Sequence, residues 1–225
     1  MHLSLSPSRA DVLTIDVHFD LICPWCLIGK RQLAAALAEL GREAPGVTVR
    51  LRWHPVQLVP EVPAGGWPFA EFYERRLGSP GAVRLRQQQV LDAARQAGAD
   101  IDLSRIRVFP NTTLAHQLLA TVAAGAEAER YEALLERLFA AYFVHGEDIG
   151  DAATLTAIAA ETGLDEGVLV QWREQGAARL RSAVGHAVRG VPDFCVNNRI
   201  RLSGAQPPER LLAALRAALD AGVAA

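Results

Sequence analysis

Two cysteines separated by two residues lie where the sequence changes from a strand pattern to a helix pattern. Residues 12–19 alternate between apolar and polar side chains, which is the two-residue period of a strand. From Cys26 onward, apolar residues recur with the period of a helix, which Gly41 is expected to end in the left-handed conformation. The motif C-P-W-C therefore joins a buried strand to a helix and places Cys23 at the helix N-terminus.

This placement predicts different roles for the two sulfurs. Unpaired N–H groups and the positive end of the helix dipole favour the thiolate of Cys23 over its thiol. Pro24 suits the first turn, because it has no N–H to leave unsatisfied. Cys26 follows one turn later, within disulfide reach but more buried. We expect Cys23 to be the nucleophile and Cys26 to resolve the mixed disulfide, with no bound organic cofactor because the dithiol itself carries two electrons.

A cysteine pair of this spacing has two other interpretations, half of a zinc site or two unrelated core thiols. A structural zinc site needs four ligands, usually from a second such pair or from two spaced histidines, and the sequence has neither pattern. Acidic residues do gather in a loop beside His145, but charged loop residues are usually only hydrated. They are Glu147, Asp148 and Asp151. We therefore predict redox chemistry and no metal.

The segment DLICPWCLIGKRQL resembles the active-site segment of DsbA-family thioredoxin-fold oxidoreductases, specifically of the FrnE-like branch. Three further segments resemble that branch in the same order: NTTLAHQLL, FAAYFVHGEDIGD and GVPDFCVNNRIRLSGAQPPERLLAAL. The resemblance spans nearly the whole chain. It implies a thioredoxin fold and a protein disulfide oxidoreductase activity.

The resemblance also implies a substrate-binding site around Val191 and Pro192. In such folds the proline of a Val-Pro pair is cis and lies opposite the cysteine motif, and the preceding residue pairs through its main chain with the substrate. Main-chain pairing tolerates many peptide sequences. Trp25, between the cysteines, is a candidate apolar contact for a docking peptide, or it only covers the disulfide.

Other polar residues are weaker candidates. Asn111 and His116 are candidates to line a substrate groove, but helix capping or packing is the interpretation that we favour for both. His18 and Asp20 flank the strand end near Cys23, where we expect them to be solvated rather than to relay a proton or adjust the pKa of Cys23. Cys195 is expected to be a small buried residue on the opposite strand face from Pro192, with a third redox thiol as the alternative.

The order of the predicted elements is strand, helix, strand, helical segments, hairpin, helix. Asp151 and Asp165 are expected to cap two of the helices, and Asn197-Asn198 fits the tight turn of the hairpin. The pattern predicts an α/β protein, a thioredoxin fold interrupted by an all-α helical insertion domain. The expected parts are residues 11–64 and 187–222 for the thioredoxin-fold domain and 65–186, helical from residue 69, for the insertion.

Composition restricts the kinds of molecule that the chain is expected to bind. It has 225 residues, with 23 Lys and Arg against 25 Asp and Glu, so charge gives no reason to expect nucleic acid or a membrane surface. The first residues lack the pattern of a secretory signal, which predicts a cytoplasmic location. The expected partners are protein or peptide thiols and disulfides, with glutathione as a recycling reductant or co-substrate. The chain is expected to be a monomer or a homodimer.

Two other functions remain open from the sequence. Glutathione-dependent isomerases resembling 2-hydroxychromene-2-carboxylate isomerase, and kappa-class glutathione transferases, share the fold but place a serine where Cys23 stands. The intact cysteine pair argues against them. A non-enzymatic module that holds unfolded peptides is the second alternative. The direction of electron flow (oxidase, reductase or isomerase) depends on tens of millivolts, which residue identities do not fix.

Overall fold

A computed structural model describes residues 12–125, 128–175 and 190–223. Its main element there is a four-stranded sheet in the order β2-β1-β5-β6. β1 (Val12–Phe19) runs parallel to β2 (Thr48–Pro55) and antiparallel to β5 (Asp193–Val196), and β5 pairs antiparallel with β6 (Ile200–Ser203). Strands from the N-terminal and the C-terminal part of the sequence thus form one sheet.

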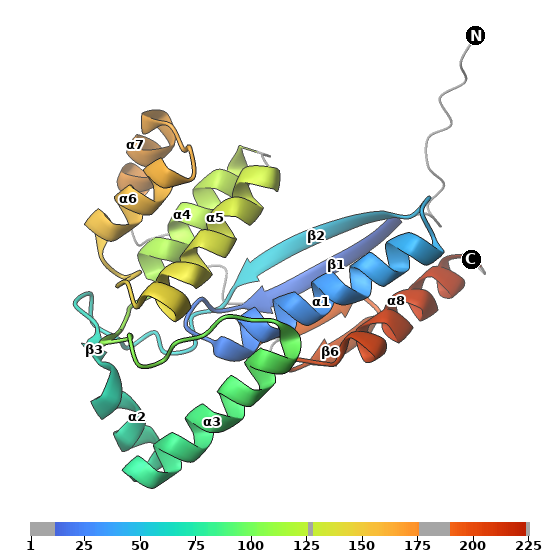
Figure 1. Ribbon diagram of the computed structural model, residues 1–225. Helices are drawn as coiled ribbons and strands as arrows, with labels where there is room; N and C mark the ends of the chain where they lie inside the picture. The colour runs from blue at the N-terminus through green and yellow to red at the C-terminus, as the bar shows by residue number, and fades with distance from the viewer. Residues whose placement is uncertain (1–11, 126–127, 176–189, 224–225) are drawn as a thin grey trace.

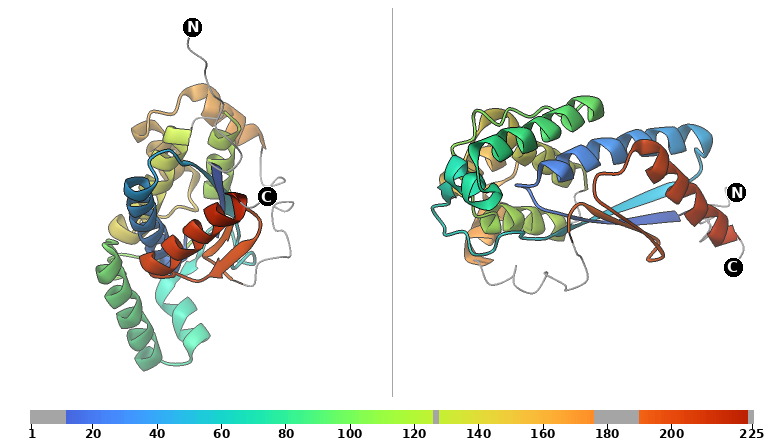
Figure 2. Two further views of the ribbon diagram at one scale, coloured as in Figure 1. Left: turned by 90° about the vertical axis from the view of Figure 1, so that its right-hand side faces the viewer. Right: turned by 90° about the horizontal axis from the view of Figure 1, so that it is seen from below.

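Two helices cover one face of this sheet and bury its alternating apolar residues. α1 (Pro24–Glu43) and α8 (Pro208–Val223) lie side by side in Figure 1, and Figure 2 shows both on the same side of the strands. Leu13, Ile15 and Val17 of β1 pack with Leu33 of α1 and Leu215 of α8 in one buried cluster. The strand period predicted for residues 12–19 is therefore confirmed, because the alternate side chains face the helices.

Gly41 does not end α1, contrary to the prediction. The helix continues to Glu43, and the N–H of Ala44 donates to the Leu40 carbonyl 2.8 Å away. The Arg216 guanidinium of α8 forms an ion pair with the Glu43 carboxylate. Contact with α8 thus holds the last turn, and tertiary packing outweighs the weak helix propensity of glycine.

The segment between the two parts of the sheet is mostly helical. It contains α2 (Phe69–Leu77), α3 (Pro80–Ala97), α4 (Thr113–Ala124), α5 (Ala128–Ala140), the π-helix η2 (Ala141–His145), α6 (Ala152–Glu161) and α7 (Glu166–Gln175). The prediction that the pattern is helical throughout from residue 69, in separate segments, is wrong at β4 (Val108–Phe109), which pairs with β3 (Trp67–Pro68). Strands of two residues are too short to leave a period. Residues 176–186 of the predicted insertion lie outside the described residues.

The predicted caps and turn are confirmed. The Asp151 carboxylate accepts the Thr154 N–H at 2.8 Å, and Asp165 accepts the Val168 N–H at 3.0 Å. Asn197 and Asn198 adopt φ angles of 48° and 56° between β5 and β6, which asparagine tolerates in tight hairpin turns.

An ion cluster fastens the helical insertion to α1. The Lys30 ammonium lies 2.7 Å from both Glu132 and Glu136 of α5, and the Arg31 guanidinium donates to both oxygens of Glu136 at 2.6 and 2.7 Å. The Trp53 indole N–H of β2 also donates to Glu132, at 2.6 Å. Two adjacent residues of α1 therefore position α5 beside the sheet.

Replacing Glu136 with glutamine is expected to lower the free energy of unfolding by about 1 kcal/mol, because water partly screens this carboxylate. Burial by itself raises the pKa of Glu136, but hydrogen bonds from Arg31 and Lys30 outweigh it and hold that pKa at about 2, against a usual value of 4.5. A depressed pKa stabilises the fold above 4.5, and this stabilisation is lost as pH falls toward 2. In urea titrations, the difference between wild type and Glu136→Gln should therefore shrink below pH 4.5. A difference that stays constant would contradict this assignment.

These elements form a thioredoxin fold interrupted by a helical insertion, as predicted. A β-α-β unit and the later hairpin with its helix share the sheet, and α2 to α7 gather near the end of the sheet where α1 begins, with α4 to α7 at the upper left and α2 and α3 at the lower left of Figure 1. In the part of the chain that the structure describes, no helix is both long and apolar enough to cross a membrane.

Candidate active site

Cys23 is the N-cap residue of α1, as the sequence predicts. Its N–H donates to the Asp20 carbonyl at 3.1 Å, and its own carbonyl accepts the Cys26 N–H at 2.9 Å. Pro24 takes the first helical position. Both cysteines are free thiols, with Cys23 6% and Cys26 2% exposed. The turn thus places Cys23 at the outer edge of the motif and Cys26 behind it.

Cys26 is held in its protonated form. Burial raises the pKa of the Cys26 thiol well above its usual value, and its hydrogen bond to Cys23 and the charge on Cys23 raise it further. The backbone N–H of Asp20 acts in the opposite direction on this pKa, but burial dominates. A protonated Cys26 can donate its hydrogen bond to a thiolate on Cys23. A buried, protonated thiol suits the role of resolving thiol for Cys26, with Cys23 in front of it as the nucleophile.

The loop before β5 lies directly opposite Cys23. The Val191–Pro192 peptide bond is cis, and the Cys23 thiol donates to the Val191 carbonyl oxygen at 3.7 Å. A glycine in α1 permits this approach, because a Cβ on Gly29 would lie 3.0 Å from Cγ of Pro192 and 3.1 Å from Cζ of Phe194. The structure therefore brings Val191 and Pro192 beside the cysteine motif, where the resemblance placed them.

A pocket of about 640 Å³ opens beside Cys23. Its lining comes from the start of α1, from α2 and α3, from η2, and from Gly190 and Val191; it includes Trp25 and is mainly apolar and aromatic. Small-molecule pockets span about 300–1,000 Å³, so this volume lies within their range. Trp25 is half-buried at its edge, with the Arg86 guanidinium 5.3 Å from the centre of its ring.

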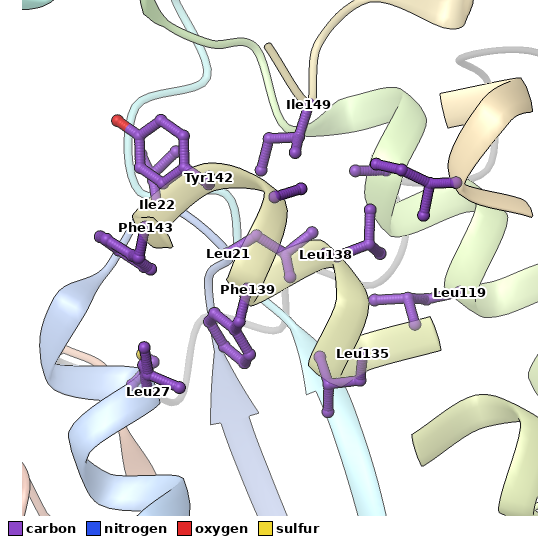
Figure 3. Close-up of a cluster of buried hydrophobic side chains, with 14 of the residues drawn as sticks. Leu21, Ile22, Leu27, Leu119, Leu135, Leu138, Phe139, Tyr142, Phe143 and Ile149 are labelled. Atoms are coloured by element: carbon purple, nitrogen blue, oxygen red, sulfur yellow. The ribbon is translucent and has the colours of Figure 1, made fainter. Parts of the chain in front are cut away.

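Two tyrosines contribute neutral phenols to the pocket. Burial raises the pKa of Tyr73 to about 12 and that of Tyr142 well above its usual value. Figure 3 shows Tyr142 and Phe143 of η2 beside Ile22, with the Tyr142 hydroxyl directed away from the apolar side chains around Leu138. Gly146 ends η2 with φ of 70°, and a Cβ there would lie 2.4 Å from the Arg105 carbonyl oxygen. The π-helix thus needs this glycine.

Asp20 is fully buried, so the expectation that it is solvated is wrong. Its Oδ1 lies 3.0 Å from Nε2 of His116, and its Oδ2 accepts the Leu58 N–H at 2.8 Å. The side chains of Asp20 and His116 are both 0% exposed, and the Phe19 ring packs edge-on against the imidazole. The strand end next to the cysteine motif is covered by α4, which the local sequence pattern does not reveal.

Neither Asn111 nor His116 lines the pocket, so the candidate role of these residues in a substrate groove is not supported. His116 is buried behind the site. Asn111 accepts the Thr113 N–H at 2.9 Å and the Gln57 amide N–H at 2.9 Å. His116 is therefore a packed residue, and Asn111 binds the backbone at the start of α4.

The remaining polar candidates lie on the sheet or hold the fold together. Cys195 is buried on β5, opposite Asp16 of β1 and Arg201 of β6. His18 stacks on His54 with ring centres 4.9 Å apart, and burial and His54 lower the pKa of His18. These side chains therefore belong to the sheet rather than to the pocket.

The acidic residues of the loop after η2 also make contacts that stabilise the fold. Glu147 forms an ion pair with Arg137 at 3.1 Å, Asp148 accepts the Gly150 N–H at 2.9 Å, and Asp151 caps α6. Within the described ranges, no group of three or more His, Cys, Asp or Glu side chains is arranged to hold a metal ion.

Known proteins resemble this chain in sequence and in fold. The model of the DSBA-like thioredoxin domain matches residues 14–216. The uncharacterized protein YwbO of Bacillus subtilis is 25% identical over 193 residues, 83% of this chain and 88% of YwbO. The crystal structure of a probable DsbA oxidoreductase, SCO1869 from Streptomyces coelicolor, superposes with a TM-score of 0.80 at 25% identity, covering 92% of this chain and 90% of that one.

The fold alone is shared with the cytosolic disulfide reductase DsbM from Pseudomonas aeruginosa, whose structure was solved with GSH. Its TM-score is 0.61 at 23% identity, over 92% of this chain and 99% of that one. The family model covers most of the chain and includes the cysteine motif, the cis proline and both parts of the sheet. The chain belongs to the DSBA-like thioredoxin domain family.

Proposed function

We propose that this chain is a protein thiol–disulfide oxidoreductase that works through the Cys23–Cys26 dithiol and disulfide. One observation carries the proposal: Cys23 begins α1 beside an apolar pocket, its thiol lies 3.7 Å from the Val191 carbonyl, and Cys26 is buried one turn behind it. A nucleophile, a resolving thiol and a main-chain docking edge thus meet at one place.

The reaction runs in two exchange steps. The Cys23 thiolate attacks one sulfur of a substrate disulfide, so that a Cys23–substrate disulfide forms and the other substrate sulfur leaves as a thiolate that takes up a proton. Cys26 then loses its proton and attacks the Cys23 sulfur, which closes the Cys23–Cys26 disulfide and releases the second substrate thiol. Two electrons have then passed to the substrate; the reverse sequence oxidises a substrate dithiol.

Reduction of the closed disulfide needs an external thiol, and we propose glutathione. Two glutathione molecules supply the two electrons and leave as glutathione disulfide. The chain has three cysteines, so at least one of them has no partner for a disulfide within the chain. Such a set does not suit the disulfide framework of a small secreted protein, and we therefore also propose a cytoplasmic location. The four segments quoted above support a place in the FrnE-like branch.

The test is reduction of a disulfide-linked fluorescent peptide in a glutathione buffer. Wild type should accelerate the reaction, Cys23→Ser should reduce the rate to that of the buffer, and Cys195→Ser, which lies on the sheet, should match wild type. Equal rates for wild type and Cys23→Ser would contradict the proposal. If Cys23→Ser/Cys26→Ser then still suppresses aggregation of an unfolded protein, the peptide-holding function would take its place.

A further inference from the structure

The formally charged side chains that line the pocket beside Cys23 are all positive. Among the described residues that line it, Arg76 of α2 and Arg86 of α3 are the ones with a formal charge, and no carboxylate joins them. Both arginines are exposed, and neither forms an ion pair within the described part of the chain. Two cations thus stand at an apolar pocket without an anionic partner.

Aromatic rings place these cations at the pocket. The Arg76 guanidinium lies 6.0 Å from the centre of the Phe72 ring, and that of Arg86 lies 5.3 Å from the centre of Trp25, next to the nucleophile. Both positive charges act to lower the pKa of the pocket phenol Tyr73, although burial dominates there. Their field therefore reaches the interior of the pocket.

One polar group of the lining also lacks a partner. The Tyr142 side chain is 1% exposed, and its hydroxyl has no hydrogen-bond partner among the described residues. A buried hydroxyl without a partner is costly unless a ligand satisfies it. Because the phenol stays protonated, it can donate to a carbonyl or carboxylate oxygen of a bound chain.

We propose that this site selects acidic polypeptide substrates, namely segments with an apolar side chain next to the disulfide cysteine and Asp or Glu flanking it. The apolar side chain enters the pocket, the acidic side chains meet Arg76 and Arg86, and the Tyr142 hydroxyl donates to the segment. This inference rests on the proposed function, because it names the substrate class of the same site.

A polypeptide fits this pocket better than glutathione does. Glutathione is anionic, but neither its glutamyl nor its glycyl part carries an apolar side chain. The pocket is lined chiefly by aromatic and aliphatic groups, including Phe72 and Trp25, whose contact area a peptide side chain would cover. The Val191 carbonyl adds a main-chain acceptor for an extended segment.

Two peptides test the selection. Each carries a phenylalanine next to a disulfide-linked cysteine, flanked by two aspartates in one and two lysines in the other. Reduced wild type should reduce the acidic peptide about tenfold faster, as kcat/KM, and the preference should shrink at high salt. Arg76→Glu/Arg86→Glu should reverse the preference.

Arg75→Glu/Arg84→Glu is the matched control. It changes two exposed arginines of the same helices that do not line this pocket, so net charge changes equally. This control should retain the preference for the acidic peptide. Equal rates for both peptides in wild type, or equal reversal by both double variants, would overturn the selection but leave the oxidoreductase in place. If wild type reduces neither peptide, the proposed function itself fails.

Discussion

Cys26→Ala is expected to stop turnover at the mixed disulfide. Without the resolving thiol, the first exchange at Cys23 still proceeds, but release of the substrate then depends on an external thiol. Loss of an intramolecular attack should lower the steady-state rate by a factor of about 100 or more. With excess disulfide-linked peptide, about one equivalent should accumulate on Cys23, and mass spectrometry would measure it.

The matched variant is Cys23→Ala, which removes the sulfur at the edge of the pocket and leaves Cys26, 2% exposed, behind it. This variant should form no adduct with the same peptide. An adduct that instead maps to Cys26 or Cys195 would contradict the assignment of Cys23 as nucleophile.

Asp20→Ala is expected to lower the free energy of unfolding by about 3 kcal/mol. The substitution leaves the fully buried His116 imidazole and the Leu58 N–H without their acceptor, and breaking a buried polar pair costs this order of energy. Chemical denaturation at pH 7 measures the change. A loss below about 1 kcal/mol would contradict the importance of this pair for the fold.

Asp20→Asn separates the charge of this residue from its packing. The amide keeps an oxygen acceptor, so the stability loss should be smaller than with alanine. The Asp20 charge contributes to the raised pKa of Cys26, so its removal should lower that pKa. A lower pKa increases the Cys26 thiolate at a given pH, and the pH profile for resolving a preformed Cys23 mixed disulfide should shift to lower pH. An unchanged profile would show that the charge does not act on Cys26.

Local sequence patterns predicted the helix start that positions Cys23 and the turn between the last two strands. The switch from a strand period to a helix period at Cys23 was sufficient to place it at the N-terminus of α1, and the Asn197-Asn198 pair was sufficient to place the hairpin turn. Both depend on interactions between near neighbours in the sequence. Val191 and Pro192 were placed by resemblance, since nothing in their local pattern joins them to a cysteine motif far away in the chain.

Contacts between distant residues were missed. Asp20 and His116 are separated by 96 positions, and each taken alone fits a solvated strand end or a helix surface. Arg76 and Arg86 look like ordinary polar positions of two helices, because only the packing of α3 against α1 and of α2 against α3 brings them to the pocket. The end of α1 was misplaced for the same reason, since its last turn depends on α8.

A redox titration in glutathione buffers tests directly whether Cys23 and Cys26 form one dithiol–disulfide couple. Thiols are trapped at each potential with an alkylating mass tag and assigned by peptide mapping. We predict that Cys23 and Cys26 lose their thiols together, as one two-electron couple, with Cys195 unchanged over that range; the midpoint then gives the favoured direction of electron flow. Independent oxidation of the two cysteines, or the absence of a Cys23–Cys26 disulfide at every potential, would contradict the dithiol mechanism.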